Sequence, residues 1–200
     1  MFVLLPPAAL GLIGAGEGNV SFRLGAHVLA TPTGVNKAEL PPDGLVLTTL
    51  DGAPLVEGQR PSSELPMHLA VYRARPDVAA IVHAHPLTAI ALTLAGISLE
   101  APLLAEAVTA LGGGVPTAPY ATPSTEEMAR TVATTLGARD ACCMGWHGAL
   151  AVGRTLDEAC DRMETVERLA QIVLRARLLG ADPAPLPPDE IARLLKLAGR

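Results

Sequence analysis

The segment Ile81-Val82-His83-Ala84-His85-Pro86 decides how this sequence is interpreted, because it places two histidines at the end of a β-rich run. Residues two apart on a strand project to the same face, so His83 and His85 can bind one ion together. Taken alone, the same pattern also fits a strand end with two solvated or hydrogen-bonded imidazoles.

A third histidine lies in a distant turn, Gly145-Trp146-His147-Gly148. With His83 and His85 it would supply three protein ligands and leave coordination positions open for water or substrate. A structural zinc site is usually closed by four ligands, so this number is typical of a catalytic site. Three imidazoles favour Zn2+, and Mn, Co or Fe can occupy the same kind of site.

Length and composition indicate one folded unit that binds small molecules. The 200 residues are half apolar and 18% charged, enough for one sizeable core, so we expect a single domain over residues 1–200. The net charge of -5, without a Lys/Arg cluster, argues against a nucleic-acid partner or a membrane surface.

The cysteines and the N-terminus bear on the cellular compartment. The three cysteines are odd in number and form no C-x-x-C pair, which predicts a reducing compartment, the cytoplasm. The apolar stretch Met1 to Ile13 lacks a basic start and contains Pro6-Pro7, so we interpret it as a buried segment rather than a signal peptide.

The order of predicted elements indicates an α/β fold. Gly and Pro breaks in the N-terminal third separate short strands, and helices follow, the first opening at Ser62-Ser63-Glu64 with Pro66 in its first turn. Capping boxes at Ser124/Glu127 and Thr155/Glu158 begin two further helices. Strands are expected at 19–23, 27–31, 44–49, 77–85, 141–144 and 149–152, and helices at 62–75, 86–96, 124–136, 155–179 and from 187 onward. These elements predict a three-layer sandwich in which helices cover both faces of a mostly antiparallel central sheet.

Three segments share the chemistry of phosphate binding: accessible backbone at glycine, small hydroxyls and a free helix N-terminus. Each pattern alone is ordinary turn chemistry, and Asn19 also fits a left-handed turn residue. The segments are Gly16-Glu17-Gly18-Asn19-Val20-Ser21, Thr31-Pro32-Thr33-Gly34 and Pro61-Ser62-Ser63-Glu64.

Glu64 is a second candidate functional residue. It lies in the first turn of a predicted helix and shares a face with His68, one turn later. A carboxylate there can simply complement the helix dipole. Its place after a phosphate-binding pattern and before the histidine pair favours a functional role.

Six motifs in this order resemble the class II aldolase/adducin family, from about Leu10 to near Leu179. They are G-x-G-N-V-S-x-R, T-P-T-G-V, S-S-E-x-x-x-H, H-A-H-P, A-P-Y-A-T-P-x-T and W-H-G. The resemblance implies zinc bound by His83, His85 and His147, with Glu64 as acid/base. It also implies a homotetramer with active sites between subunits, and a substrate phosphate held by Asn19, Thr33, Gly34, Ser62 and Ser63.

The resemblance implies cleavage of a ketose 1-phosphate, such as L-fuculose 1-phosphate, to dihydroxyacetone phosphate and an aldehyde. A metal would polarise the carbonyl, and Glu64 would shuttle the proton that makes or quenches the carbanion. The alternatives are a ribulose-5-phosphate 4-epimerase, a methylthioribulose-phosphate dehydratase, a branch acting on other hydroxy-acid phosphates, and a non-catalytic adducin-like binding domain.

The sequence departs from the family at one position that matters for catalysis. The sugar-phosphate aldolases of this family carry a tyrosine, before the A-P-Y motif, that protonates the aldehyde product across a subunit boundary. The corresponding stretch, Leu103 to Gly114, contains no tyrosine. Tyr120 of the A-P-Y motif is the remaining catalytic candidate, and orienting a turn is the alternative role for it.

Overall fold

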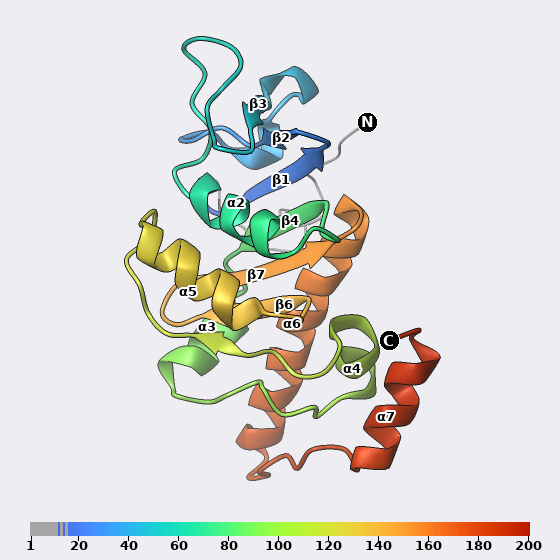
Figure 1. Cartoon of the computed structure of the whole chain (residues 1–200). Coiled ribbons are helices and arrows are strands. Elements are labelled where there is room, and N and C mark those ends of the chain that lie inside the picture. Colours follow the sequence, from blue (N-terminus) through green and yellow to red (C-terminus); the bar gives the residue numbers. More distant parts are fainter. Residues whose placement is uncertain (1–11, 13, 15) are drawn as a thin grey trace.

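A central sheet organises the computed structural model, which describes residues 12, 14 and 16–200 (Figure 1). Within these residues, seven strands pair in the order β3-β2-β1-β4-β7-β6-β5. All neighbours are antiparallel except β5 and β6, so the expected mostly antiparallel sheet is confirmed. The strands are β1 (Asn19–Leu24), β2 (His27–Ala30), β3 (Val46–Thr49), β4 (Ala80–Ala84), β5 (Thr117–Ala118), β6 (Ala141–Met144) and β7 (Gly148–Gly153).

Helices cover both faces of this sheet, which confirms the three-layer prediction (Figure 1). Alternating residues of β4 enter two separate apolar clusters, because successive strand side chains point to opposite faces. Val82 packs with residues of α3, α4 and α6, whereas Ile81 packs with residues of α2 and α5. The helices are α2 (Leu65–Ala74), α3 (Leu87–Leu94), α4 (Ala105–Leu111), α5 (Glu126–Leu136), α6 (Leu156–Leu178) and α7 (Pro188–Leu197), with short 3-10 turns at Lys37–Glu39 and Pro42–Gly44.

The predicted start of α5 is wrong by one residue. Thr125, not Ser124, is the N-cap, and its hydroxyl accepts a hydrogen bond from the Met128 N–H at 3.2 Å. Ser124 has a φ of 64°, which is incompatible with the extended backbone of an N-cap residue. The cap predicted at Thr155 is confirmed, since its hydroxyl accepts from the Glu158 N–H at 3.1 Å.

Two elements were not predicted from the sequence. Helix α4 has 7 residues, too few for a clear helical period, and it ends at Gly112 with a left-handed φ of 78°. Strand β5 has 2 residues and is defined by its parallel pairing with β6, a partner far along the chain.

The apolar stretch Met1 to Ile13, interpreted as a buried segment, lies outside the described residues except for Leu12. Leu12 is buried, and its carbonyl accepts a hydrogen bond from the His85 N–H at 2.8 Å. Among the helices of the described chain, none combines the length and apolar character needed to cross a membrane.

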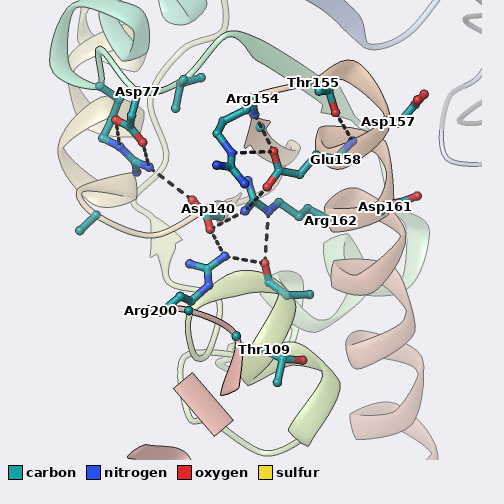
Figure 2. A pocket seen from close by; sticks show the side chains of 17 residues that line it. Asp77, Thr109, Asp140, Arg154, Thr155, Asp157, Glu158, Asp161, Arg162 and Arg200 are labelled. Atoms are coloured by element: carbon teal, nitrogen blue, oxygen red, sulfur yellow. Dashed lines mark hydrogen bonds and ion pairs between the residues drawn. The ribbon is translucent and has the colours of Figure 1, made fainter. Parts of the chain in front are cut away.

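A charged cluster ties the sheet to its helices at the start of β6 (Figure 2). The Asp140 side chain is 6% exposed and lies 3.0 Å from an Arg162 nitrogen and 3.3 Å from an Arg75 nitrogen. The Arg200 guanidinium also donates to Asp140. These groups line a cavity of about 790 Å3. The buried Asp140 thus contacts three arginines, of which Arg75 also pairs with Asp77 and Arg162 also pairs with Glu158.

Replacing Asp140 by Ala should lower the free energy of unfolding by about 2 kcal/mol, because the charged hydrogen bonds of this buried carboxylate are lost, while Arg75 keeps Asp77 and Arg162 keeps Glu158. Urea unfolding measures this loss. The matched control is Asp51→Ala, since the Asp51 side chain is 94% exposed and its Arg73 contact is 3.9 Å long. Equal stability losses in the two variants would contradict the anchoring role of Asp140.

Candidate active site

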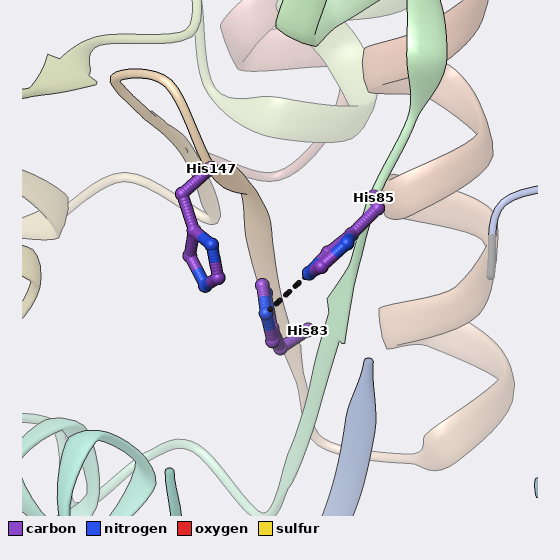
Figure 3. Close-up of side chains that lie close together, drawn as sticks. All are labelled: His83, His85 and His147. Atoms are coloured by element: carbon purple, nitrogen blue, oxygen red, sulfur yellow. Dashed lines mark hydrogen bonds between the residues drawn. The ribbon is translucent and has the colours of Figure 1, made fainter. Parts of the chain in front are cut away.

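Three imidazoles converge at one end of the sheet (Figure 3). His83 is buried in β4, His85 directly follows β4, and His147 lies in the turn between β6 and β7. Their ring centroids are 5.0 Å apart in each pair, and one nitrogen from each ring lies within 4.8 Å of the other two. The structure therefore brings together the three histidines that the sequence predicts as metal ligands.

The donor atoms fit a divalent metal. The Nδ1 of His83 lies 2.9 Å from the Ala149 carbonyl oxygen, so Nδ1 carries a proton and Nε2, which lies 3.2 Å from the His85 Nε2, is the nitrogen placed to bind a metal. Burial, reinforced by His83 and His147, lowers the pKa of His85 to about 4, which leaves its ring neutral at pH 7. Neutral imidazoles with converging nitrogens are the form that binds zinc-like cations.

Gly148 is required for this convergence. A Cβ atom at this position would lie 2.5 Å from the Ala84 carbonyl oxygen and about 3 Å from the rings of His83 and His85. Any other residue would therefore push β7 away from β4 where the histidines meet. The W-H-G motif thus supplies a candidate metal ligand, His147, and the glycine that lets β7 lie close to β4 beside it.

Glu64 lies against two of the histidines. Its Oε1 is 3.0 Å from the His147 Nε2, and its Oε2 is 3.3 Å from the His83 Nε2. Burial opposes ionisation of Glu64, but its hydrogen bonds to His147 and His83 outweigh that effect and hold its pKa below the usual range. Glu64 is therefore an ionised carboxylate at neutral pH, which is the form required of a general base.

Asn19 is the first residue of β1 and forms a hydrogen bond with the Glu64 carboxylate. Strand β1 pairs with β4 so that Asn19 lies opposite His83, and its Nδ2 donates to Glu64 Oε2 at 2.7 Å. The Oδ1 of Asn19 is buried and lacks a partner among the described atoms. In this arrangement Asn19 orients Glu64, while its predicted phosphate role stays a prediction.

The other predicted phosphate residues lie in two adjoining loops. The Ser62 N–H donates to the Thr31 carbonyl at 2.9 Å, and the Thr33 N–H donates to the Arg60 carbonyl at 3.1 Å. Ser63 Oγ accepts from the Ser124 hydroxyl at 3.0 Å, and Gly34 has a φ of 71°. An anion at these loops would therefore meet hydroxyl groups rather than the N–H groups of Thr33 and Ser62.

The sequence also matches a known family over most of its length. The model of the Class II Aldolase and Adducin N-terminal domain matches residues 7–174. The chain belongs to the class II aldolase and adducin family. The ordered motifs and the assembled histidines agree with this assignment.

Relatives within the class II aldolase and adducin family share the sequence and the fold. The chain is 37% identical to an L-fuculose phosphate aldolase of Escherichia coli K12, over 90% of this chain and 83% of that protein. It is 36% identical to a 5-methylthioribulose-1-phosphate/5-deoxyribulose-1-phosphate aldolase of Rhodospirillum rubrum, over 94% and 83%. The solved L-fuculose-1-phosphate aldolase of Thermus thermophilus superimposes with a TM-score of 0.80 at 41% identity, covering 92% of this chain and 96% of that one.

Tyr120, the predicted catalytic tyrosine of this family member, lies outside the Glu64 cluster. Its side chain is 55% exposed and meets the 61% exposed Trp146 edge-on, with ring centroids 6.3 Å apart. Trp146 precedes His147 and has a φ of 57°, which is strained for a bulky residue. Tyr120 therefore lies beside the turn that carries His147 and is available to a substrate or to a second subunit.

One buried lysine near the site escaped the sequence analysis. Lys37 is 5% exposed, and its Nζ donates to the Gly16 carbonyl at 2.6 Å. Burial lowers the pKa of Lys37, and the negative charge of Glu64 partly offsets this effect. Lys37 follows the Thr33-Gly34 loop in a 3-10 turn, and no motif separates it from a solvated lysine in the sequence.

Alanine at both His83 and His85 should remove most of the bound metal while the fold stays largely intact, because two of the three converging nitrogens disappear. Metal analysis after loading with one divalent cation per chain measures the loss. His27→Ala is the matched control, since His27 lies in β2, away from β4. Full metal occupancy in the double variant would disprove the assignment.

Proposed function

We propose that this protein is a metal-dependent aldolase that cleaves a ketose 1-phosphate, such as L-fuculose 1-phosphate, to dihydroxyacetone phosphate and an aldehyde. One observation carries the proposal: the Glu64 carboxylate lies within 3.3 Å of nitrogens of two histidines in a converging set of three. Aldol chemistry requires such a base beside an electrophilic centre.

The three histidines would hold the metal, for which Zn2+ is our first choice. When bound, the cation would polarise the substrate carbonyl and so make the neighbouring C–H bond acidic. Glu64 would take that proton from carbon during synthesis and return it during cleavage. The Asn19 amide, 2.7 Å from the carboxylate, restricts the orientation of Glu64.

The substrate class follows from the family and from the loops beside the site. Both curated relatives described above are named as aldolases of sugar phosphates. Hydroxyl groups of Thr33, Ser62 and Ser63 would bind the phosphate. A carboxylate assembled with three histidines favours an aldolase over a dehydratase lacking this acid, and over an adducin-like binding domain.

Three further properties belong to this proposal. Residues 1–200 would form one domain built on the single sheet of the described chain. Four copies would assemble with active sites between subunits, where the exposed Tyr120 can reach a neighbouring site. The enzyme would work in the cytoplasm, in keeping with three free, buried cysteines.

Glu64→Gln should lower metal-dependent tritium exchange from dihydroxyacetone phosphate by at least about 100-fold, because the amide cannot accept the proton. The variant should retain its metal, since the three histidines are unchanged. Exchange and metal content are measured on the same preparation. The proposal fails if the wild-type protein shows no metal-dependent exchange, and the epimerase and dehydratase alternatives then take precedence.

Tyr120→Phe should slow carbon–carbon cleavage more than tritium exchange, because only cleavage needs a proton at the aldehyde oxygen. Both rates are measured on the same variant, so exchange serves as the internal control. Equal slowing of the two rates would assign Tyr120 to the packing of its turn. Unchanged cleavage would show that another group delivers this proton.

A further inference from the structure

Two rows of polar side chains meet between α2 and β1. Glu64, the N-cap residue of α2, and His68 and Tyr72 within α2 recur every four positions and so share one face. On β1, Asn19 and Ser21 share one face of the strand. Asn19 forms a hydrogen bond with Glu64, and Ser21 forms hydrogen bonds with both His68 and Tyr72.

Ser21 is the centre of this contact. Its hydroxyl lies 2.7 Å from the His68 Nδ1 and 2.8 Å from the Tyr72 hydroxyl. The side chains of all three residues are buried, next to an apolar cluster that includes Leu69 and Ile81. A shift of α2 along β1 would leave these buried polar groups without partners, so the bonds fix the position of the helix on the strand.

The hydrogen bonds have a defined direction. Tyr72 donates its hydroxyl to the Ala79 carbonyl at 3.3 Å, so its oxygen accepts from Ser21. The Ser21 oxygen then accepts from the Nδ1–H of His68. Burial lowers the pKa of His68 to about 3, so the ring is neutral and its Nε2 is a bare acceptor.

The Nε2 side of the His68 ring is not used by the bond to Ser21. Its Nε2 is buried and has no hydrogen-bond partner among the described residues. The ring interacts electrostatically with both His83 and Glu64. Nothing in the proposed chemistry above uses His68, although it is almost completely buried one helical turn from the proposed base.

We propose that His68, held by Ser21, is a positioning residue that fixes the Glu64 carboxylate against the histidine cluster. The inference rests on the proposed aldolase function. Glu64 is the residue before the first turn of α2, and its side chain makes no capping bond to that helix. Its position therefore depends on where α2 lies on β1, which the Ser21–His68 bond helps to fix together with the Ser21–Tyr72 bond.

The kinetic test compares four variants of the metal-loaded protein in tritium exchange from dihydroxyacetone phosphate. In His68→Phe and Ser21→Ala, kcat should fall by about 10- to 100-fold with KM within about twofold of wild type, because a base displaced by about 1 Å loses efficiency. In His68→Asn, whose amide can donate to Ser21, kcat should return to within about threefold of wild type. Val71→Ala removes a fully buried side chain of the same helix and should leave kcat unchanged.

If His68 only stabilised the fold, the kcat of Val71→Ala would fall together with its stability, as in His68→Phe. The kcat of His68→Asn would then also stay low. Either result overturns the inference.

Crystal structures of the metal-free variants supply a readout that is independent of activity. In His68→Phe and Ser21→Ala, the distance from Glu64 Oε1 to His147 Nε2 should increase from 3.0 Å, whereas His68→Asn should preserve it. An unchanged distance in both disruptive variants overturns the positioning role. If wild-type protein lacks exchange activity, the proposed function fails, and the structures alone decide the role of His68.

Discussion

The candidate site depends on the antiparallel register of β4 with its two neighbours. On one side Asn19 lies opposite His83, and on the other Leu150 does. These pairings place the end of β4 beside the start of β1 and beside the turn before β7. A slip by one residue would turn His83 to the other face of the sheet, away from α2 and Glu64. Backbone pairing is thus the constraint that brings site residues from distant segments of the chain together.

Local chemistry was sufficient to predict much of this molecule. Several predictions rest on patterns of only a few neighbouring residues: the H-A-H spacing, the glycine after His147 and the serine pair before Glu64. The helix start at Thr155 was predictable for the same reason. Elements defined by remote partners were not: β5 exists through its pairing with β6, and α4 is too short to show a period.

The same distinction explains which site residues were missed. Lys37 has no local pattern that separates it from a solvated lysine, and its burial depends on the loop around Gly16. The link from His68 to Ser21 joins residues on two elements far apart in the chain. Asn19 was predicted as a phosphate ligand from its glycine-rich surroundings, but its contact with Glu64 requires knowledge of how α2 lies on β1.

The Asp140 cluster lies at the opposite end of the central strands from the histidines. It precedes β6 and adjoins the last residue of β7, whereas His147 lies between these strands at their other end. Mutations beside the histidines can therefore alter the chemistry without touching this electrostatic anchor. This separation favours evolvability, because mutations at the site can change the substrate while the ion pairs that stabilise the fold are retained.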